Sequence, residues 1–142
     1  MDASTRYQPT VELLEAAGPL DGVIIASPSN PTGTVLGPDE LRELVEWADA
    51  NNVRFISDEI YQGLTYDDVE TATATAFSDS AIVINSFSKY FSMTGWRIGW
   101  TVLPTELTGL FDRLAQNLVI CPPAISQHMA VAALDCLSLI HI

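Results

Sequence analysis

The protein has 142 residues, of which 48% are hydrophobic, and a formal net charge of −12. This size and composition predict one ordinary domain with a hydrophobic core, and the acidic charge argues against nucleic acid or an anionic membrane as partners. No apolar run has the length of a membrane span and the first residues lack the apolar segment of a signal peptide, so we expect a cytoplasmic protein.

The first half of the chain predicts helices that alternate with strands. Helices are expected where apolar residues recur every three or four positions, and buried strands where a short run is continuously apolar. Proline in the first turn and acidic residues beside it mark the start of the longer helix. In chain order we expect a short helix over 11–17, a strand over 23–26, a loop over 27–33, a helix from 37 to about 52, and a strand over 53–57.

The second half begins with residues 67–80, whose Asp67-Asp68 pair and Thr-Ala tract predict a solvated surface stretch. The elements after it are expected to be a strand over 81–85, a strand that begins at Arg97 and ends before Pro104, a helix over 105–120 with Thr105 as its N-cap, and a helix over 124–134.

Strands that alternate with helices predict an α/β fold, with a mostly parallel sheet and helices on both faces. In such folds ligands bind beyond the carboxyl ends of the strands. Asn30, Asp58 with Tyr61, and the run from Ser86 to Lys89 all fall just after predicted strands. We therefore expect these three segments to place their polar side chains along one edge of the sheet.

Lys89 is the only lysine in the chain, and it follows an apolar strand. An amine in a partly dry pocket becomes a nucleophile toward carbonyls, whereas the plainer interpretation is a surface lysine. Ser86, Ser88 and Arg97 could hold a phosphate group near the same amine. A ligand that carries both an aldehyde and a phosphate satisfies this set of residues, and pyridoxal 5'-phosphate is such a cofactor.

The other polar residues suit the ring of that cofactor. A carboxylate at Asp58 would keep the ring nitrogen protonated, and Asn30 and Tyr61 would hydrogen-bond the phenolic oxygen. Lys89, once displaced by a substrate amine, could move a proton at the α-carbon. Each residue also has an ordinary interpretation: Asn30 as a turn residue, Asp58 as a cap, and Tyr61 as a packed ring.

Three motifs carry a resemblance to a known family: Ser-Pro-Ser-Asn-Pro-Thr-Gly at 27–33, Ser-Asp-Glu-Ile-Tyr at 57–61, and Ser-Phe-Ser-Lys-Tyr-Phe-Ser-Met-Thr-Gly-Trp-Arg-Ile-Gly at 86–99. The chain resembles the class I/II aminotransferases, which are fold-type I pyridoxal phosphate enzymes. The resemblance runs from about residue 20 to residue 134. It implies a homodimer and an aminotransferase that moves an amino group from an amino acid to a 2-oxo acid.

By this resemblance, Lys89 forms the Schiff base with pyridoxal phosphate and Asp58 pairs with the pyridine nitrogen. Tyr61 and Asn30 contact the phenolic oxygen. Ser86 and Arg97 hold the phosphate, and Ser88 is a further candidate for that role.

The resemblance also implies an incomplete protein, because family members run to several hundred residues. We expect residues 1–136 to be part of the cofactor-binding large domain, and the chain alone to be inactive. Residues 137–142, Leu-Ser-Leu-Ile-His-Ile, are what translation of CTG TCT CTT ATA CAC ATC yields. That DNA resembles a transposon end used in preparing sequencing libraries, so we expect a non-native tail.

Metal chemistry is not indicated. Cys121 and Cys136 form no CxxC motif, and His128 and His141 have no ligands at metal-binding spacing. We expect both cysteines to be buried as small apolar residues.

Two alternatives to an aminotransferase stay open. The same residues could serve a pyridoxal phosphate-dependent lyase, either a C–S β-lyase or a decarboxylase, because they do not decide the fate of the substrate carbanion. An aminotransferase-like domain could also bind the effector of a transcription regulator. The sequence does not identify the amino acid or the oxo acid.

Overall fold

The computed structural model describes residues 1–136, so the tail expected at 137–142 lies outside the described residues. The helices are α1 (Val11–Ala16), α2 (Pro38–Ala50), α3 (Thr105–Leu118) and α4 (Ala124–Asp135). Short 3-10 turns lie at η1 (Ala3–Thr5), η2 (Ala74–Ala76) and η3 (Thr94–Trp96). The strands are β1 (Gly22–Ala26), β2 (Arg54–Asp58), β3 (Ile82–Ser86) and β4 (Gly99–Val102).

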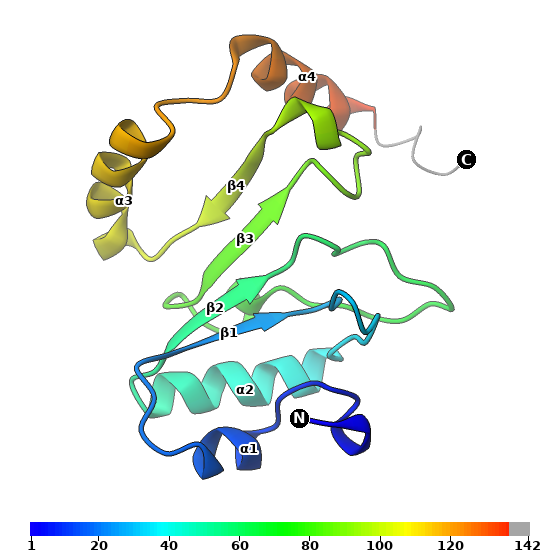
Figure 1. The fold of residues 1–142 in the computed structure, drawn as a ribbon, viewed down its shortest axis with the longest axis vertical. Coiled ribbons are helices and arrows are strands. Elements are labelled where there is room, and N and C mark those ends of the chain that lie inside the picture. Colours follow the sequence, from blue (N-terminus) through cyan, green and yellow to red (C-terminus); the bar gives the residue numbers. More distant parts are fainter. Residues whose placement is uncertain (137–142) are drawn as a thin grey trace.

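The strands of the described part form one sheet in the order β1-β2-β3-β4 (Figure 1). The first three are parallel, and β4 is antiparallel to β3. Ala26 lies opposite Asp58, and Asp58 lies opposite Ile84. The carboxyl ends of the parallel strands therefore meet at one edge, which we call the strand-end rim, and the expected mostly parallel α/β fold is confirmed.

Helix α2 covers one face of the sheet and builds the main core. Its residues Leu44, Val45 and Ala48 are at most 2% exposed, and they belong to one cluster with Phe55 and Val83 of the strands. Because side chains alternate along a strand, every second residue of β2 and β3 points at this helix. The helix begins with Pro38 and a hydrogen bond of 2.8 Å from the Gly37 N–H to Glu40 Oε2.

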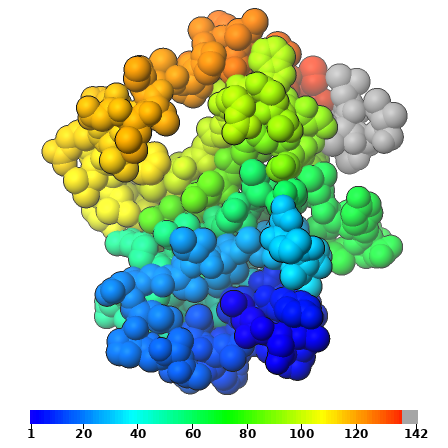
Figure 2. Space-filling model, viewed as in Figure 1, coloured from blue at the N-terminus to red at the C-terminus, as the bar shows by residue number. Residues whose placement is uncertain are grey.

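The opposite face of the sheet is covered only in part. Residues Ile56, Ile82 and Ile84 line a hollow of about 330 Å³ whose other wall is α3. Figure 2 shows this hollow between α3, in yellow, and the green strands. Ile24, on the same face of β1, is 73% exposed. The helices thus lie on both faces, as expected, but α3 leaves much of the second face open.

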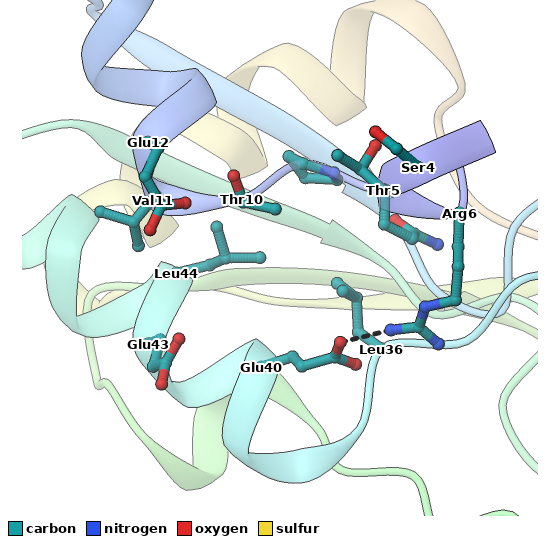
Figure 3. Close-up of a pocket in the computed structure, with 12 residues that line it drawn as sticks. Ser4, Thr5, Arg6, Thr10, Val11, Glu12, Leu36, Glu40, Glu43 and Leu44 are labelled. Atoms are coloured by element: carbon teal, nitrogen blue, oxygen red, sulfur yellow. Dashed lines mark hydrogen bonds and ion pairs between the residues drawn. The ribbon is translucent and has the colours of Figure 1, made fainter. Parts of the chain in front are cut away.

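The N-terminal segment packs against the start of α2, as Figure 3 shows. The Arg6 guanidinium forms an ion pair with Glu40 and also donates to the Val35 carbonyl at 3.2 Å. The buried Gln8 amide donates to the Ala26 carbonyl and to the Thr34 carbonyl, both at 3.3 Å. These contacts tie the first residues to the loop that follows β1.

Residues 67–80 are not simply a solvated surface stretch, so that expectation is wrong in part. Ala74, within η2, is fully buried and belongs to the main core cluster. The stretch has no helical or strand periodicity, yet alanine is small enough to fill a gap in the core without one. The segment between β2 and β3 therefore helps to cover the sheet.

Three smaller expectations are also corrected. Thr105 is the first residue of α3 rather than its cap, since Pro104 holds the cap position and no side chain caps this helix. The last strand begins at Gly99, because Arg97 has a left-handed backbone with φ of 50°. Cys121 and Cys136 are exposed rather than buried. Among residues 1–136, no helix is long and apolar enough to cross a membrane.

Candidate functional site at the strand-end rim

The strand-end rim brings together the three segments that the sequence singles out. The loop that carries Asn30 follows β1, Asp58 is the last residue of β2, and the run that leads to Lys89 begins at the end of β3. Backbone hydrogen bonds fix these exits to one another: the Ser27 N–H donates to the Asp58 carbonyl at 3.2 Å, and the Glu59 N–H to the Ile84 carbonyl at 2.9 Å. The rim is therefore a continuous part of the sheet.

Tyr61 is the residue through which the rim groups meet. Its hydroxyl accepts a hydrogen bond of 3.1 Å from the Asn30 amide. The Lys89 ammonium group lies over its ring, 5.4 Å from the ring centre, within the range of a cation–π interaction. Side chains from the ends of all three parallel strands thus form one row: an amide, a phenol and an amine.

Asp58 stands at the centre of the rim and is half-buried. One of its carboxylate oxygens, Oδ1, accepts a hydrogen bond of 3.1 Å from the Ile60 N–H. This bond turns the chain just after β2 and so leads it toward Tyr61. The carboxylate is held in place by local backbone and retains acceptor capacity for a ligand.

Ser86 and Ser88, in the run that leads to Lys89, form a hydroxyl pair. The Ser86 hydroxyl lies 2.9 Å from that of Ser88 and also donates to the Ile98 carbonyl at 3.0 Å. The Ser88 carbonyl accepts from the Thr94 hydroxyl at 2.8 Å. The lysine loop is therefore tied to the start of β4 on both sides of Arg97.

The Arg97 side chain is exposed, and its guanidinium donates to the Thr94 carbonyl at 2.9 Å. It follows η3 and precedes β4, so its backbone lies beside the serine pair although its side chain is turned to Thr94. A guanidinium has further donors, and these stay available for an anion at the rim.

An open hollow of about 500 Å³ adjoins the rim and shares Asn30 and Tyr61 with it. Its other walls come from the loop after β1 and from the segment after Tyr61. Among the residues that the structure describes, its lining includes no charged side chain. The apolar members of the lining are Pro28, Pro31, Val35, Leu64 and Val69.

Glu59 is a buried carboxylate beside the rim, to which the sequence assigns no role. It is only 2% exposed, and its Oε1 accepts a hydrogen bond of 2.8 Å from the Ala74 N–H. Asp58 and Glu59 thus point to different places, one to the rim and the other to the core. In the sequence, only the adjacency of the two acids at a strand end indicates that they face different surroundings. This adjacency does not show which of the two is buried.

The contact between Gly63 and Tyr90 is also not predicted by any sequence pattern. Gly63 has φ of +85°, and a Cβ atom added to it would lie 2.7 Å from the Tyr90 ring. One residue comes shortly after Tyr61 and the other directly after Lys89, yet nothing in their spacing of 27 positions predicts that they meet. Their contact is a product of the tertiary fold.

Comparison with known proteins identifies a family and several relatives that the chain resembles. A family model described as "Aminotransferase class I and II" matches residues 3–139. The curated "Valine--pyruvate aminotransferase" of Mycobacterium tuberculosis is 53% identical over 131 residues, which cover 91% of this chain and 34% of that protein.

Two solved structures have a closely similar backbone. An aminotransferase from Mycobacterium tuberculosis superposes with a TM-score of 0.90 at 51% identity, covering 94% of this chain and 37% of that one. A structure described as a PLP-dependent aminotransferase from Streptococcus suis gives a TM-score of 0.89 at 27% identity, covering 99% and 37%. The chain thus spans about a third of the length of the relatives that it matches.

Proposed function

The chain belongs to the class I and II aminotransferase family, and from this premise we propose that residues 1–136 carry the cofactor-binding rim of a pyridoxal phosphate-dependent aminotransferase. Such an enzyme moves an amino group from an amino acid to a 2-oxo acid. The family model, the relatives with aminotransferase names and the fold support the assignment. We assign the residues to part of the large domain of a longer protein.

One observation carries the proposal: Tyr61 contacts both the Asn30 amide and the amine of Lys89, the only lysine of the chain. These residues come from the ends of three different strands. Packing alone would not require an amine, a phenol and an amide to gather at the point where parallel strands end. The carboxyl edge of a parallel sheet is where α/β proteins bind their ligands.

The polar groups at the rim fit pyridoxal phosphate group by group. A primary amine suits an aldehyde, a carboxylate suits a protonated ring nitrogen, phenol and amide donors suit a phenolate oxygen, and hydroxyl groups with a guanidinium suit a phosphate. We propose these roles for Lys89, Asp58, Tyr61 with Asn30, and Ser86, Ser88 and Arg97. Bound there, pyridoxal phosphate would supply an electrophilic carbon and a ring that accepts electrons from the substrate.

The residues then act by holding charge and moving protons. The Asp58 carboxylate would keep a proton on the ring nitrogen, because a negative group close to a cation favours the charged form. The Tyr61 hydroxyl and the Asn30 amide would stabilise negative charge at the phenolic oxygen. Lys89 would act as general base and acid at the substrate α-carbon, a role typically worth about 10²–10⁴ in rate.

The substrates are a further part of the proposal. The name of the Mycobacterium tuberculosis relative makes valine and pyruvate the first pair to test. The net charge of −12 favours small-molecule substrates over nucleic acid or anionic membrane. We also propose a homodimeric, cytoplasmic protein. The relatives are named as aminotransferases rather than as lyases or regulators, which favours transamination.

Reduction with borohydride tests the site. The chain has only two primary amines, those of Lys89 and of the Met1 terminus. After incubation with pyridoxal phosphate and reduction, peptide mapping is expected to find the pyridoxyl label mainly on Lys89, and Lys89→Gln is expected to leave only the terminal label. Equal labelling of both amines, with no preference for Lys89, would contradict the assignment.

A chimera tests the activity, because the chain spans only about a third of its relatives. In the Mycobacterium tuberculosis relative, residues 1–136 of this chain replace the matching segment, and amino transfer from valine to pyruvate is measured. The chimera is expected to transaminate and its Lys89→Gln variant is not, while the 142-residue chain alone is expected to show negligible turnover. Release of ammonia without an acceptor would instead indicate a lyase.

A further inference from the structure

The turn that follows Tyr61 lies close to the Tyr90 ring, which comes from another loop. The turn is closed by a hydrogen bond of 3.0 Å from the Leu64 N–H to the Tyr61 carbonyl, and Gly63 within it has φ of +85°. A Cβ atom at Gly63 would lie 2.7 Å from Cε2 and 2.8 Å from Cδ2 of Tyr90. Both the backbone conformation and the space therefore require glycine at this position.

The Tyr90 ring cannot easily move away from Gly63, because it is the last ring in a row of aromatic contacts. It packs edge-on against Phe91 at 5.2 Å, and Phe91 packs against Phe87 at 4.9 Å. Phe87 is buried and meets Trp100 of β4 edge-on at 5.1 Å. Such pairs add stability beyond their buried area. The row anchors Tyr90 to the sheet.

The two partners sit beside the central groups of the rim. Gly63 comes two residues after Tyr61, and Tyr90 comes directly after Lys89. A contact between Gly63 and Tyr90 thus joins the segment after β2 to the segment after β3, close to where the Lys89 amine lies 5.4 Å from the centre of the Tyr61 ring.

We propose that the Gly63–Tyr90 contact sets the position of the Tyr61 ring relative to the Lys89 amine. Tyr90 is then a positioning residue that acts through its ring and not through its hydroxyl. The effect on the geometry stands on the structure alone, whereas its effect on the reaction with pyridoxal phosphate rests on the proposed function.

Nuclear magnetic resonance can measure the geometry without any cofactor. Because Lys89 is the only lysine, isotopically labelled lysine gives one ε-methylene signal from the 142-residue chain. The Tyr61 ring is expected to shift that signal upfield, and Tyr61→Leu removes the shift and so calibrates it. Gly63→Ala and Tyr90→Ala are both expected to lose most of the shift, whereas Tyr90→Phe keeps it.

Gly18→Ala is the matched control for backbone strain. Gly18 has the same φ of +85° as Gly63, but nothing lies within 4 Å of a Cβ atom added to it. This variant bears the same conformational cost without the clash, so the Lys89 shift is expected to persist. Circular dichroism identifies the variants that fold. If Gly63→Ala does not fold, the difference in the Lys89 shift between Tyr90→Ala and Tyr90→Phe still decides whether the Tyr90 ring positions Tyr61.

The second readout is the ratio of pyridoxyl label on Lys89 to label on the Met1 amine after borohydride reduction. Misplacement of reacting groups by about 1 Å can cost about a hundredfold in rate, so a fall of at least about tenfold in this ratio is expected for Gly63→Ala. Tyr90→Ala removes the ring that a Cβ atom at Gly63 would meet. When Gly63→Ala is added to Tyr90→Ala, the further change in the label ratio is therefore expected to be no larger than the change that Gly18→Ala causes in the parent.

The outcomes separate the two proposals. An unchanged Lys89 shift and label ratio in folded Gly63→Ala and Tyr90→Ala overturns the positioning role and leaves the proposed function standing. A parent chain whose Lys89 is not labelled in preference to Met1 overturns the proposed function, while the resonance measurement still decides the positioning role. Loss of the shift in Tyr90→Phe would show that the hydroxyl acts, and would also overturn the proposal as stated.

Discussion

Two neighbouring acids at the end of β2 have opposite surroundings. Asp58 lies at the strand-end rim, where its carboxylate accepts from the Ile60 N–H, and Glu59 is buried and accepts from the Ala74 N–H. Since successive side chains of an extended chain point to opposite sides, one of any such pair faces the core. The buried acid holds the returning chain near η2 in place.

Removing the acceptor at Glu59 is expected to destabilise the chain. Glu59→Leu leaves the Ala74 N–H without its partner, which costs about 1–3 kcal/mol of unfolding free energy, whereas Glu59→Gln keeps an acceptor oxygen and is expected to lose less. Urea unfolding at low protein concentration measures both. Hydrogen exchange of the peptide that contains Ala74 gives the local check, and equal protection in the parent and in Glu59→Leu would contradict the assigned bond.

The residues of the site could be predicted from the sequence to different degrees. Asn30, Tyr61 and Lys89 each follow a strand in a recognisable motif, and the structure brings them into contact. The contact of Gly63 with Tyr90 and that of Glu59 with Ala74 could not be predicted, because each depends on how a long connection folds back. Local patterns carry no information about such a return.

At the scale of the elements, α2 is the best anchored helix. Its first turn combines proline, two acidic residues and the Gly37–Glu40 hydrogen bond, and its inner face carries Leu41, Leu44, Val45 and Ala48. Proline, acids and an apolar stripe of this spacing are the strongest sequence indications of a helix. The bounds that the sequence predicts, 37 to about 52, are accordingly close to the observed Pro38–Ala50.

Glu40 links α2 to the N-terminal segment in a manner that depends on pH. Partial burial raises the pKa of Glu40, but the Arg6 guanidinium and the Gly37 N–H outweigh it, so the pKa lies below its ordinary 4.5. A carboxyl group with a lowered pKa stabilises the folded state above its ordinary pKa and loses that contribution as the pH falls through the folded value.

We therefore expect Glu40→Gln to lower the unfolding free energy at pH 7 by up to about 1 kcal/mol, the range for exposed ion pairs. The difference from the parent should shrink as the pH falls below 4.5, where the parent carboxylate becomes protonated. Urea unfolding of both proteins at several pH values between 7 and 3 measures this difference in unfolding free energy. Glu43→Gln is the control, since Glu43 lines the same pocket in Figure 3 without a drawn partner. An equal difference at pH 3 and pH 7 would exclude the ion pair as the cause.

The less accurate element predictions have physical causes. Proline at position 104 already turns the chain into α3, so Thr105 enters the helix instead of capping it. The left-handed conformation of Arg97 delays β4 by two residues. A periodic pattern in the sequence locates neither the exact cap residue of a helix nor a single left-handed residue.

For the whole molecule, the main feature is apolar surface that residues 1–136 do not cover. Within this part of the chain β1 pairs only with β2 and β4 only with β3, so both edges of the sheet are open. Several apolar side chains of α3 and α4 are more than half exposed: Leu110, Leu114, Leu118, Ile125, Val131 and Leu134. Open edges and apolar patches of this kind favour association.

Adjacent residues of β1 allow a matched test of this feature. Ile24 is 73% exposed on the open face, and Ile25 is 3% exposed on the face covered by α2. Ile24→Thr is expected to reduce self-association while changing the unfolding free energy by less than about 0.5 kcal/mol. Ile25→Thr buries a hydroxyl and is expected to cost about 1–3 kcal/mol.

Light scattering measures the association of the two variants and urea unfolding measures their stability. If Ile24→Thr associates as strongly as the parent, the open face is not what drives association. The fold class could be predicted at this scale because it follows from alternating elements, whereas the order of the strands in the sheet could not. The exposure of Cys121 and Cys136 could not be predicted either, because burial depends on what the fold packs against a residue and not on the residue type; Cys121 lies between α3 and α4, and Cys136 follows α4.

The connection between β2 and β3 has one more consequence. It carries Tyr61 at one end and the core residue Ala74 near the other, and Glu59 joins the two through a buried bond. A molecule bound at the rim would therefore also restrain the connection between β2 and β3, which contributes Ala74 to the core. Ligand affinity and conformational stability are thermodynamically linked through this one stretch, so occupancy of the rim protects the domain against unfolding, and loosening of the core weakens ligand binding.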